Sequence, residues 1–281
     1  MTIEEYLDQF IENAIKEDVG DGDHTSLSCI PASEKGRMHL IIKQNGILAG
    51  VEVALRVFQK IDKDIKLRLF LPDGSEVKKG DIVLEVEGKV QSLLLAERLV
   101  LNIMQRMSGI ATKTSRYVSK LKGLKTKVLD TRKTTPGMRL LEKAAVKIGG
   151  AQNHRIGLYD MILIKDNHID FAGGIEQAIN KTNEYLKAKN KNLKIEIEAR
   201  TIQDVEKIIE VGHIDRILLD NFSIENTRKA VSLINGCYET ESSGMITLDT
   251  IRDYAECGVD FVSVGALTHD IESLDMRLKA F

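Results

Sequence analysis

The feature that most constrains the fold is a regular alternation of strand-like and helix-like segments from Lys127 onward. The expected strands are 127–130, 161–165, 194–198, 216–220, 237–240 and 261–264, and the expected helices are 138–148, 175–187, 202–211, 224–234 and 248–257. Such alternation indicates parallel strands joined by right-handed crossovers. Each strand ends in a polar or glycine-containing cluster. Because those clusters would converge on one face, an incomplete α/β barrel is favoured over an open sheet.

The N-terminal part has a different, non-repeating order. An amphipathic helix begins at Ile3, and a second helix is expected at 51–61. Strands are expected at 38–43, 65–71 and 82–86. This order predicts a small separate domain of mixed α and β structure. A longer helical stretch, 91–121, is expected to break near Ser108-Gly109 and to lead into the second domain.

The composition excludes several classes of protein. With 281 residues, 43% hydrophobic and 29% charged, the chain has an ordinary globular composition, and a net charge of −2 argues against nucleic-acid binding. No apolar stretch is long enough to span a bilayer, and Glu4 and Glu5 near the N-terminus predict that there is no secretion signal. Cys29, Cys237 and Cys257 are far apart, which predicts free thiols in a reducing cytoplasm.

Positive charge is concentrated in residues 127–168, which hold eight Lys or Arg and four Asp or Glu, whereas the whole chain is slightly acidic. Arg132, Lys133, Arg155 and Lys165 follow expected strands or a glycine break, at the end of a barrel where ligands bind. We therefore expect an anion site there. The cations on the helix at 138–148 are expected to be solvated surface residues.

The remaining strand ends complete this predicted site. Glu198 and Asp220 follow neighbouring strands, and such carboxylates can hold a Mg²⁺ ion that also binds a substrate phosphate. Ser243-Gly244 and Gly265 precede expected helices late in the barrel, where backbone amides can bind phosphate. Either glycine alone is equally consistent with a turn or a helix cap. Lys165 could instead form a Schiff base, as in barrel aldolases.

Six ordered motifs make a family resemblance specific. They are DTRKT at 130–134, NHR at 153–155, LIKDNH at 163–168, LLDN at 218–221, ESSG at 241–244 and VGALTH at 264–269. Together they resemble the quinolinate phosphoribosyltransferases over nearly the whole chain. The resemblance implies conversion of quinolinate and phosphoribosyl pyrophosphate into nicotinate mononucleotide, pyrophosphate and CO₂, in NAD biosynthesis. It implies an α/β sandwich domain (1–109, with a last helix, 271–281, returning to it) and an incomplete barrel (110–269).

The resemblance also implies roles for individual residues. Arg98, Arg132, His154 and Arg155 would bind the two carboxylates of quinolinate. Lys165 would bridge the substrates, and Lys133 with Mg²⁺ would neutralise the pyrophosphate. Glu198 and Asp220 would hold the metal and the ribose hydroxyls. The residues that would bind the 5-phosphate are Ser243, Gly244, Gly265 and His269.

The implied assembly is a homodimer or a hexamer built as a trimer of dimers, with Arg98 acting in the neighbouring subunit's site. Two relatives remain as alternatives: an enzyme acting on nicotinate, which would share the barrel, and a protein associated with molybdenum transport, which is similar overall. The presence of Arg98, Arg132 and Arg155 together favours quinolinate, which has two carboxylates, over nicotinate, which has one. From a different class, a phosphosugar-binding protein without catalysis would not need the Glu198 and Asp220 pair.

Overall fold

The computed structural model of the protein describes residues 3–281, so the first two residues of the expected N-terminal domain lie outside it. The chain divides into two compact units. Unit 1 holds the chain up to Ser115, together with Thr135–Gly150 and Asp270–Phe281, and unit 2 holds Arg116–Thr134 and Ala151–His269. The segment Thr135–Gly150 was expected in the barrel from its place in the sequence, but it groups with unit 1.

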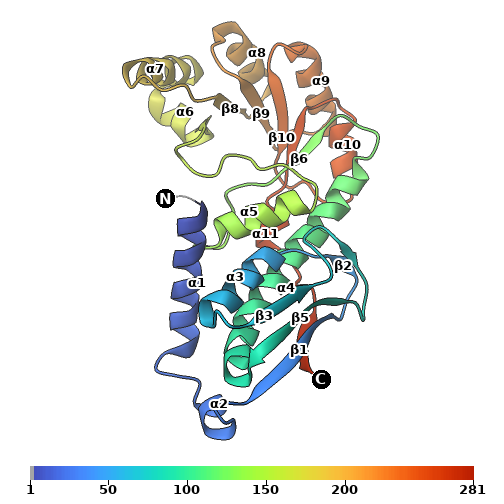
Figure 1. Cartoon of the computed structure of the whole chain (residues 1–281). Helices are drawn as coiled ribbons and strands as arrows, with labels where there is room; N and C mark the ends of the chain where they lie inside the picture. The colour runs from blue at the N-terminus through green and yellow to red at the C-terminus, as the bar shows by residue number, and fades with distance from the viewer. Residues whose placement is uncertain (1–2) are drawn as a thin grey trace. The chain divides into compact units, whose positions relative to one another are not determined.

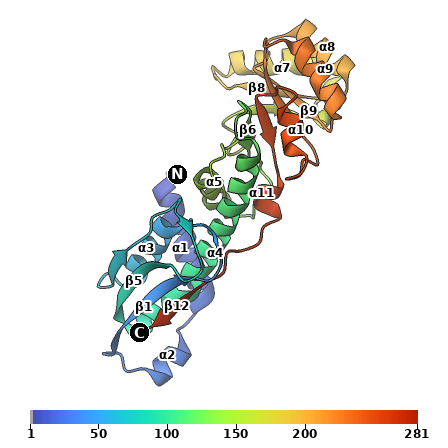
Figure 2. The same ribbon diagram turned by 90° about the vertical axis from the view of Figure 1, so that its right-hand side faces the viewer.

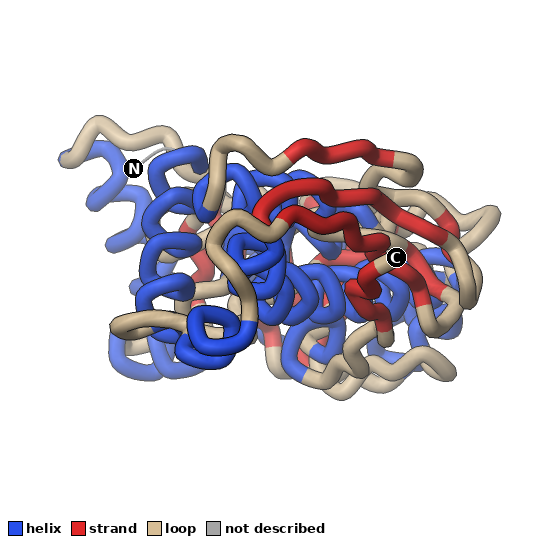
Figure 3. The backbone as a smooth tube through the Cα atoms, turned by 60° about the horizontal axis from the view of Figure 1, so that its bottom comes forward, coloured by secondary structure: helices blue, strands red, loops and turns tan. Residues whose placement is uncertain are grey.

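Unit 1 is built on a four-stranded antiparallel sheet in the order β12-β1-β5-β3. The strands of unit 1 are β1 (Lys35–Ile42), β2 (Gly46–Ile47), β3 (Lys66–Leu69), β4 (Glu76–Val77), β5 (Ile82–Lys89) and β12 (Met276–Ala280), of which β2 and β4 form a separate pair. Figure 3 shows β12 at the C-terminus beside the longer strands of this sheet. The end of the chain therefore completes a sheet that begins at Lys35.

The helices that begin in unit 1 are α1 (Ile3–Val19), α2 (His24–Cys29), α3 (Val51–Ile61), α4 (Val90–Lys120) and α5 (Arg139–Ile148). Figure 2 shows α3 and α4 beside the strands of unit 1. The expected helices at the N-terminus and at 51–61 are confirmed. Within residues 3–281, no helix is both long and apolar enough to cross a membrane.

The expected helix over 271–281 is wrong, because these residues contain strand β12. Met276 and Leu278 are buried, whereas Arg277 and Lys279 are exposed, which is the two-residue period of a strand with one covered face. Leu278 pairs with Leu40 of β1, which is also buried. Available backbone partners on β1 therefore decide the conformation of this short segment.

The expected break of α4 at Ser108-Gly109 is also wrong, because the helix is continuous from Val90 to Lys120. The buried Ser108 hydroxyl accepts a hydrogen bond from the backbone N–H of Ala49 (2.9 Å) and donates one to its carbonyl (3.1 Å). A Cβ at position 109 would lie 2.2 Å from the carbonyl oxygen of Glu272. The small residues therefore permit close packing of neighbouring segments.

Unit 2 is a six-stranded parallel sheet in the order β6-β11-β10-β9-β8-β7. Its strands are β6 (Lys127–Leu129), β7 (Ile162–Ile164), β8 (Ile195–Ala199), β9 (Arg216–Asp220), β10 (Glu239–Ser243) and β11 (Phe261–Ser263). This is the strand order of an α/β barrel left open between its first and second strands, as expected for an incomplete barrel. Strand β10 lies two to three residues later than the expected 237–240.

The helices that lie wholly in unit 2 are α6 (Asp166–Ala172), α7 (Ile175–Ala188), α8 (Ile202–Val211), α9 (Ile224–Ile234), α10 (Ile251–Ala255) and α11 (Ala266–His269). Neighbouring helices α7, α8 and α9 pack side by side along the sheet (Figure 1). The ranges expected for α8 and α9 are confirmed, whereas α6 was not expected. Helix α10 begins three residues later than the expected helix at 248–257.

The inner face of the unit 2 sheet carries charged residues at alternate positions. All five residues of β8 are buried, including Glu196 and Glu198, which are two residues apart and so share one face. The strand register places Arg216 of β9 between Glu196 and Glu239 of β10. The sheet therefore brings acidic and basic side chains into an interior that is shielded from water.

Candidate active site

Lys165 and Glu198 meet at the carboxyl ends of β7 and β8. Lys165 is the residue between β7 and α6, and its Nζ lies 3.4 Å from Glu198 Oε1. The second carboxylate oxygen of Glu198 accepts a hydrogen bond from the backbone N–H of Asp166 (3.0 Å). Two of the expected site residues are thus brought together, and the backbone fixes the orientation of the carboxylate.

Asp220 and Ser243 are the last residues of β9 and β10, and they pair in the strand register. Asn221 donates from Nδ2 to Asp220 Oδ2 (2.9 Å) and from its backbone N–H to the carbonyl of Ser243 (2.8 Å). Gly244 has φ of +99°, and a Cβ there would lie 2.2 Å from Asn221 Oδ1. The glycine is therefore required both by its backbone conformation and by this close approach.

Lys133, Gly265 and His269 also lie together. A Cβ at Gly265 would be 3.0 Å from Lys133 Cδ and 3.2 Å from His269 Nε2. The Thr268 hydroxyl donates to the carbonyl of Lys133 (2.8 Å), which joins α11 to the segment that follows β6. The helices after Gly244 and Gly265 are only five and four residues long, and α10 starts seven residues after Gly244. A phosphate site here would therefore depend on loop amides.

Arg132 and Arg155 form the cationic part of the site. Burial lowers the pKa of Arg155, and the positive charge of Arg132 lowers it further. Arg155 is buried and donates from Nη1 to the carbonyl of Met161 (3.2 Å), whereas the buried Nε of Arg132 has no hydrogen-bond partner. Two mutually repelling guanidinium groups with an unused donor are suited to receive an anion.

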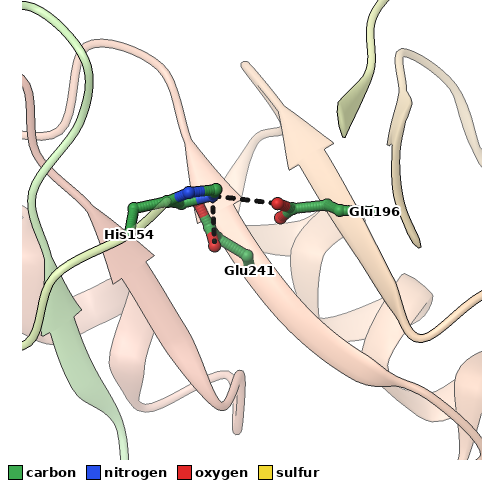
Figure 4. A group of neighbouring side chains, drawn as sticks. All are labelled: His154, Glu196 and Glu241. Carbon is green, nitrogen blue, oxygen red and sulfur yellow. Dashed lines mark ion pairs between the residues drawn. The ribbon is translucent and has the colours of Figure 1, made fainter. Parts of the chain in front are cut away.

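The inner face also holds a cluster that we did not expect from the sequence. Nε2 of His154 lies 2.9 Å from Glu196 Oε2 and 3.6 Å from Glu241 Oε2 (Figure 4). Both carboxyl groups are fully buried. Burial raises the pKa of Glu196 to about 7, while burial and the charge of Glu196 raise the pKa of Glu241 to about 8. Arg216 partly offsets this cost by donating from Nη1 to Glu241 Oε2 (2.9 Å).

The cluster is nonetheless a poor metal site, although its ligand atoms lie within 4.8 Å of one another. The backbone N–H of Arg155 donates to His154 Nδ1 (2.7 Å), so this nitrogen carries the lone pair and the proton is on Nε2. Nε2 therefore has no lone pair for a metal ion. Glu198 and Asp220, the pair expected from the sequence to hold a metal ion, lie near the carboxyl ends of the adjacent strands β8 and β9.

A sequence signal for this cluster exists in the spacing of its acids. Glu196 and Glu198 alternate in β8, as Glu239 and Glu241 do in β10. Acidic residues at every second position of a short strand indicate a charged inner face. Arg98 differs from the other expected site residues, since it is exposed on α4 in unit 1, whereas the others lie in unit 2.

Comparisons with known proteins agree over both units. The family model described as quinolinate phosphoribosyl transferase, C-terminal domain, matches residues 110–279, and the model of the N-terminal domain matches residues 23–108. A quinolinate phosphoribosyltransferase [decarboxylating] 1b from Nicotiana tabacum is 42% identical over 284 residues, covering 96% of this chain and 81% of the relative. A probable nicotinate-nucleotide pyrophosphorylase [carboxylating] from Bacillus subtilis is 39% identical, covering 97% of this chain and 92% of the relative.

Solved structures show the same similarity. The crystal structure of NadC from Streptococcus pyogenes has a TM-score of 0.93 and 37% identity, covering 100% of this chain and 99% of that chain. The nicotinate-nucleotide pyrophosphorylase from Francisella tularensis has a TM-score of 0.93 and 37% identity, covering 100% of this chain and 98% of that chain. A human nicotinic acid phosphoribosyltransferase shares only the fold, at 13% identity and a TM-score of 0.60, covering 91% of this chain and 72% of that chain.

Proposed function

The chain belongs to the quinolinate phosphoribosyltransferase family, and from this membership we infer how its own residues perform the reaction. The enzyme transfers the phosphoribosyl group of phosphoribosyl pyrophosphate to quinolinate, and releases pyrophosphate and CO₂ to give nicotinate mononucleotide for NAD biosynthesis. The observation that carries the residue assignment is the pair of mutually repelling arginines, Arg132 and Arg155, with one buried donor unused.

Quinolinate has two carboxylates, and we assign Arg132 and Arg155 to them. A guanidinium group can form two parallel hydrogen bonds to a carboxylate, and binding the anion would relieve the repulsion between the two cations. Arg98 is proposed to contact the same substrate from a neighbouring subunit. A homodimer is the simplest assembly that would provide it, and a hexamer built as a trimer of dimers would also do so.

Phosphoribosyl pyrophosphate, the second substrate, is assigned to residues other than these arginines. Lys165 would lie between the two substrates, and Lys133 would face the pyrophosphate. Glu198 and Asp220 are proposed to hold Mg²⁺ and the ribose hydroxyls, because their carboxylates end adjacent strands. When bound, Mg²⁺ would neutralise negative charge that builds up on the leaving pyrophosphate. The groups proposed for the 5-phosphate are Ser243, Gly244, Gly265 and His269.

The protein's part in this chemistry is to orient the substrates and to provide electrostatic stabilisation. Positive charge develops on the ribose carbon as pyrophosphate leaves, and the carboxylates of Glu198 and Asp220 would stabilise it. Once the ring nitrogen carries the ribose, the cationic pyridinium ring can stabilise the electron pair that departing CO₂ leaves on the neighbouring carbon, and this carbon then takes a proton from water. No separate base is then needed, and the site would act mainly by holding quinolinate and phosphoribosyl pyrophosphate in the orientation that the reaction requires.

A lysine-dependent aldolase is disfavoured by family membership and by the position of Lys165. Its Nζ lies 3.4 Å from Glu198 Oε1, so the amine faces a carboxylate rather than a carbonyl group of a substrate. We propose a cytoplasmic location from the free thiols Cys29, Cys237 and Cys257. Relatives from Arabidopsis thaliana and Nicotiana glauca carry chloroplastic and mitochondrial names respectively.

The deciding experiment measures CO₂ and nicotinate mononucleotide formed from phosphoribosyl pyrophosphate and Mg²⁺, with quinolinate and nicotinate tested in parallel. Product from quinolinate alone supports the arginine assignment. Product from nicotinate alone would overturn that assignment while keeping the fold. Absence of product from both would overturn the activity and favour the relative associated with molybdenum transport. Omission of Mg²⁺ and chelation with EDTA test the metal proposal in the same assay.

A further inference from the structure

The four-stranded sheet of unit 1 has one buried face and one exposed face. On β1, Met38, Leu40 and Ile42 are buried, whereas the residues between them are partly exposed. The same two-residue period occurs on β12 and over most of β5. Helices α3 and α4 lie beside these strands (Figure 2). The outward side chains of β1, β3, β5 and β12 form the second face, which we call the open face.

The open face is strongly basic, although the whole chain has a net charge of −2. Its residues form rows across the strands, in which, for example, His39 pairs with Lys279 of β12 and with Glu85 of β5. Two acidic residues, Glu85 and Glu87, stand against seven basic ones, which leaves an excess of five positive charges. The basic residues are Lys35, Arg37, Lys66, Arg68, Lys89, Arg277 and Lys279.

The two acids neutralise only a small part of this charge. Oε2 of Glu85 lies 3.2 Å from Nε2 of His39, and its Oε1 lies 3.9 Å from Nη1 of Arg37. Oε1 of Glu87 lies 3.1 Å from Nζ of Lys66. Within residues 3–281, the other five cations of the open face form no ion pair. The open face therefore attracts anions.

Two exposed aromatic rings lie among these cations. The ring of Phe281 stacks on the ring of His39, with centroids 3.8 Å apart, and the guanidinium group of Arg37 lies 4.8 Å from its centroid. The guanidinium group of Arg68 lies 5.1 Å from the centroid of the Phe70 ring. Phe281 is still 57% exposed and Phe70 is 42% exposed. The open face thus offers flat apolar surfaces beside positive charges.

We propose that the open face binds single-stranded RNA. Phosphates of the strand pair with the unpaired lysine and arginine side chains, and bases stack on Phe70 and Phe281. A double helix fits less well, because its bases are stacked on one another and do not reach the rings. An acidic protein or an anionic membrane would use the charge but not the rings. The net charge of the chain predicted no such binding because it averages a basic face with an acidic remainder.

The inference is independent of the proposed function. The open face belongs wholly to unit 1, whereas the residues assigned to the substrates, apart from Arg98 on α4, belong to unit 2. Saturating phosphoribosyl pyrophosphate should therefore change the RNA affinity by less than about twofold. Displacement of the RNA by this substrate would place it in the active site and overturn the proposal.

Fluorescence anisotropy with a labelled oligouridylate of about 12 nucleotides tests the proposal on the whole chain. We expect the affinity to fall about 50-fold between about 50 mM and about 200 mM salt, as for a single strand with about four neutralised phosphates. No binding at the lower salt concentration, or a fall of less than about fivefold, would overturn the proposal.

A charge variant locates the binding surface. We expect Arg68→Ser combined with Lys279→Ser to weaken RNA binding about tenfold, because two phosphate contacts are lost. The matched control is Lys189→Ser combined with Lys191→Ser, which removes the same charge from two exposed lysines of unit 2. The control should lose less than about twofold. Equal losses would show that the RNA responds only to the net charge of the protein, against the proposal.

A ring variant separates stacking from charge. We expect Phe70→Ser combined with Phe281→Ser to weaken RNA binding about tenfold or more, and to weaken binding of a labelled heparin fragment, a polyanion without bases, less than about twofold. Phe171→Ser, which removes a ring that is 91% exposed on α6, should leave both affinities unchanged. Equal losses for RNA and heparin, or no loss for either, would favour an acidic protein or a membrane as the partner and overturn the proposal.

Photo-cross-linking of the wild-type protein decides the case if the variants do not fold. The same oligonucleotide with 5-iodouridine forms cross-links to aromatic side chains on which the modified base stacks. After digestion, mass spectrometry should identify cross-linked peptides that contain Phe70 or Phe281. Cross-links confined to unit 2, or bound RNA without any cross-link to these two rings, would overturn the proposal.

Discussion

Lys165 Nζ lies 3.4 Å from Glu198 Oε1, and the other oxygen of Glu198 is held by the backbone N–H of Asp166. The lysine is about half exposed, whereas the side chain of Glu198 is only 10% exposed. The carboxylate therefore has one oxygen held by the backbone and one that faces a half-exposed lysine. We propose that Glu198 exchanges this lysine for Mg²⁺ or a ribose hydroxyl when the substrate binds.

Replacement of the Glu198 carboxylate by a neutral amide should impair the use of phosphoribosyl pyrophosphate. We expect Glu198→Gln to lower kcat/KM for this substrate by about 10² to 10³, which is typical of a lost charge that stabilises a transition state. The control is Glu176→Gln, which removes the charge of a surface pair with Lys207 at 3.2 Å. Equal activity of the two variants would contradict the assignment of Glu198.

Loss of either arginine should be selective for one substrate. We expect Arg132→Ala and Arg155→Ala to weaken quinolinate binding about 10² fold and to change the binding of phosphoribosyl pyrophosphate by less than about threefold. Titration calorimetry with each ligand separately measures this difference. Arg228→Ala, on the exposed part of α9, is the matched control. Equal losses for both ligands would contradict the assignment of the arginines to the carboxylates.

Sequence periodicity predicts the six strands and the helices α7, α8 and α9 of unit 2 well, because these helices have a long apolar pattern and the strands alternate with them. It fails where a distant segment decides the local structure. Met276 to Ala280 form a strand only because β1 offers its edge, and Gly109 remains helical because its missing side chain leaves space for Glu272. Among the residues expected in the site, the structure brings Lys165 together with Glu198, and Lys133 together with Gly265.

The cluster of His154, Glu196 and Glu241 shows a second limit of sequence reasoning. The motif at 153–155 identifies His154 as a candidate ligand, but the carboxyl groups that its Nε2 faces come from two strands more than 40 residues downstream. The orientation of an imidazole ring depends on those partners, and sequence spacing does not contain this information. Acids at alternate positions in β8 and β10 were the available signal.

Mixed subunits can test whether Arg98 acts in a neighbouring site. Arg98→Ala and Lys165→Ala should each be nearly inactive alone. If Arg98 of one subunit completes the site of another, mixing should restore up to about a quarter of the wild-type activity, because one site of a mixed dimer would keep both residues. Subunit exchange should be confirmed with differently tagged chains. No recovery after confirmed exchange would contradict the shared site.

The buried ion pair in unit 1 should contribute strongly to stability. Arg106 donates from Nε and Nη2 to Glu142 Oε1 (2.8 and 2.6 Å), and the Glu142 side chain is fully buried. Removal of the cation would leave a buried carboxylate without its charged partner. We expect Arg106→Met to lower the free energy of unfolding by about 3 kcal/mol. Urea unfolding followed by circular dichroism measures this change.

Arg56→Met is the control for that change. Arg56 pairs with Glu4 at 3.8 Å on the surface, where both side chains are well exposed. Such a pair contributes about 0 to 1 kcal/mol, so the control should unfold almost as the wild type does. Similar losses in the two variants would indicate that arginine itself, rather than burial of its acidic partner, is responsible.

The raised pKa values of Glu196 and Glu241 predict how stability depends on pH. Their folded-state pKa values of about 7 and about 8 lie above the ordinary value of 4.5, because burial disfavours the carboxylate form. Between pH 5 and 8 the folded protein therefore retains protons that the unfolded chain has lost. Their contribution to stability is present below pH 4.5 and is lost as pH rises through 7 to 8.

A comparison of Glu241→Gln with the wild type isolates this contribution. Each retained proton lowers the free energy of unfolding by up to about 1.4 kcal/mol per pH unit, so the variant should show a shallower decline between pH 5 and 8. Because Glu196 and Glu241 influence each other's pKa, the difference in slope reports on this pair, whereas the exposed Glu176→Gln should keep the wild-type slope. Urea midpoints at four pH values measure the slopes. Parallel curves for Glu241→Gln and the wild type would show that Glu241 is ionised in the folded protein throughout this range.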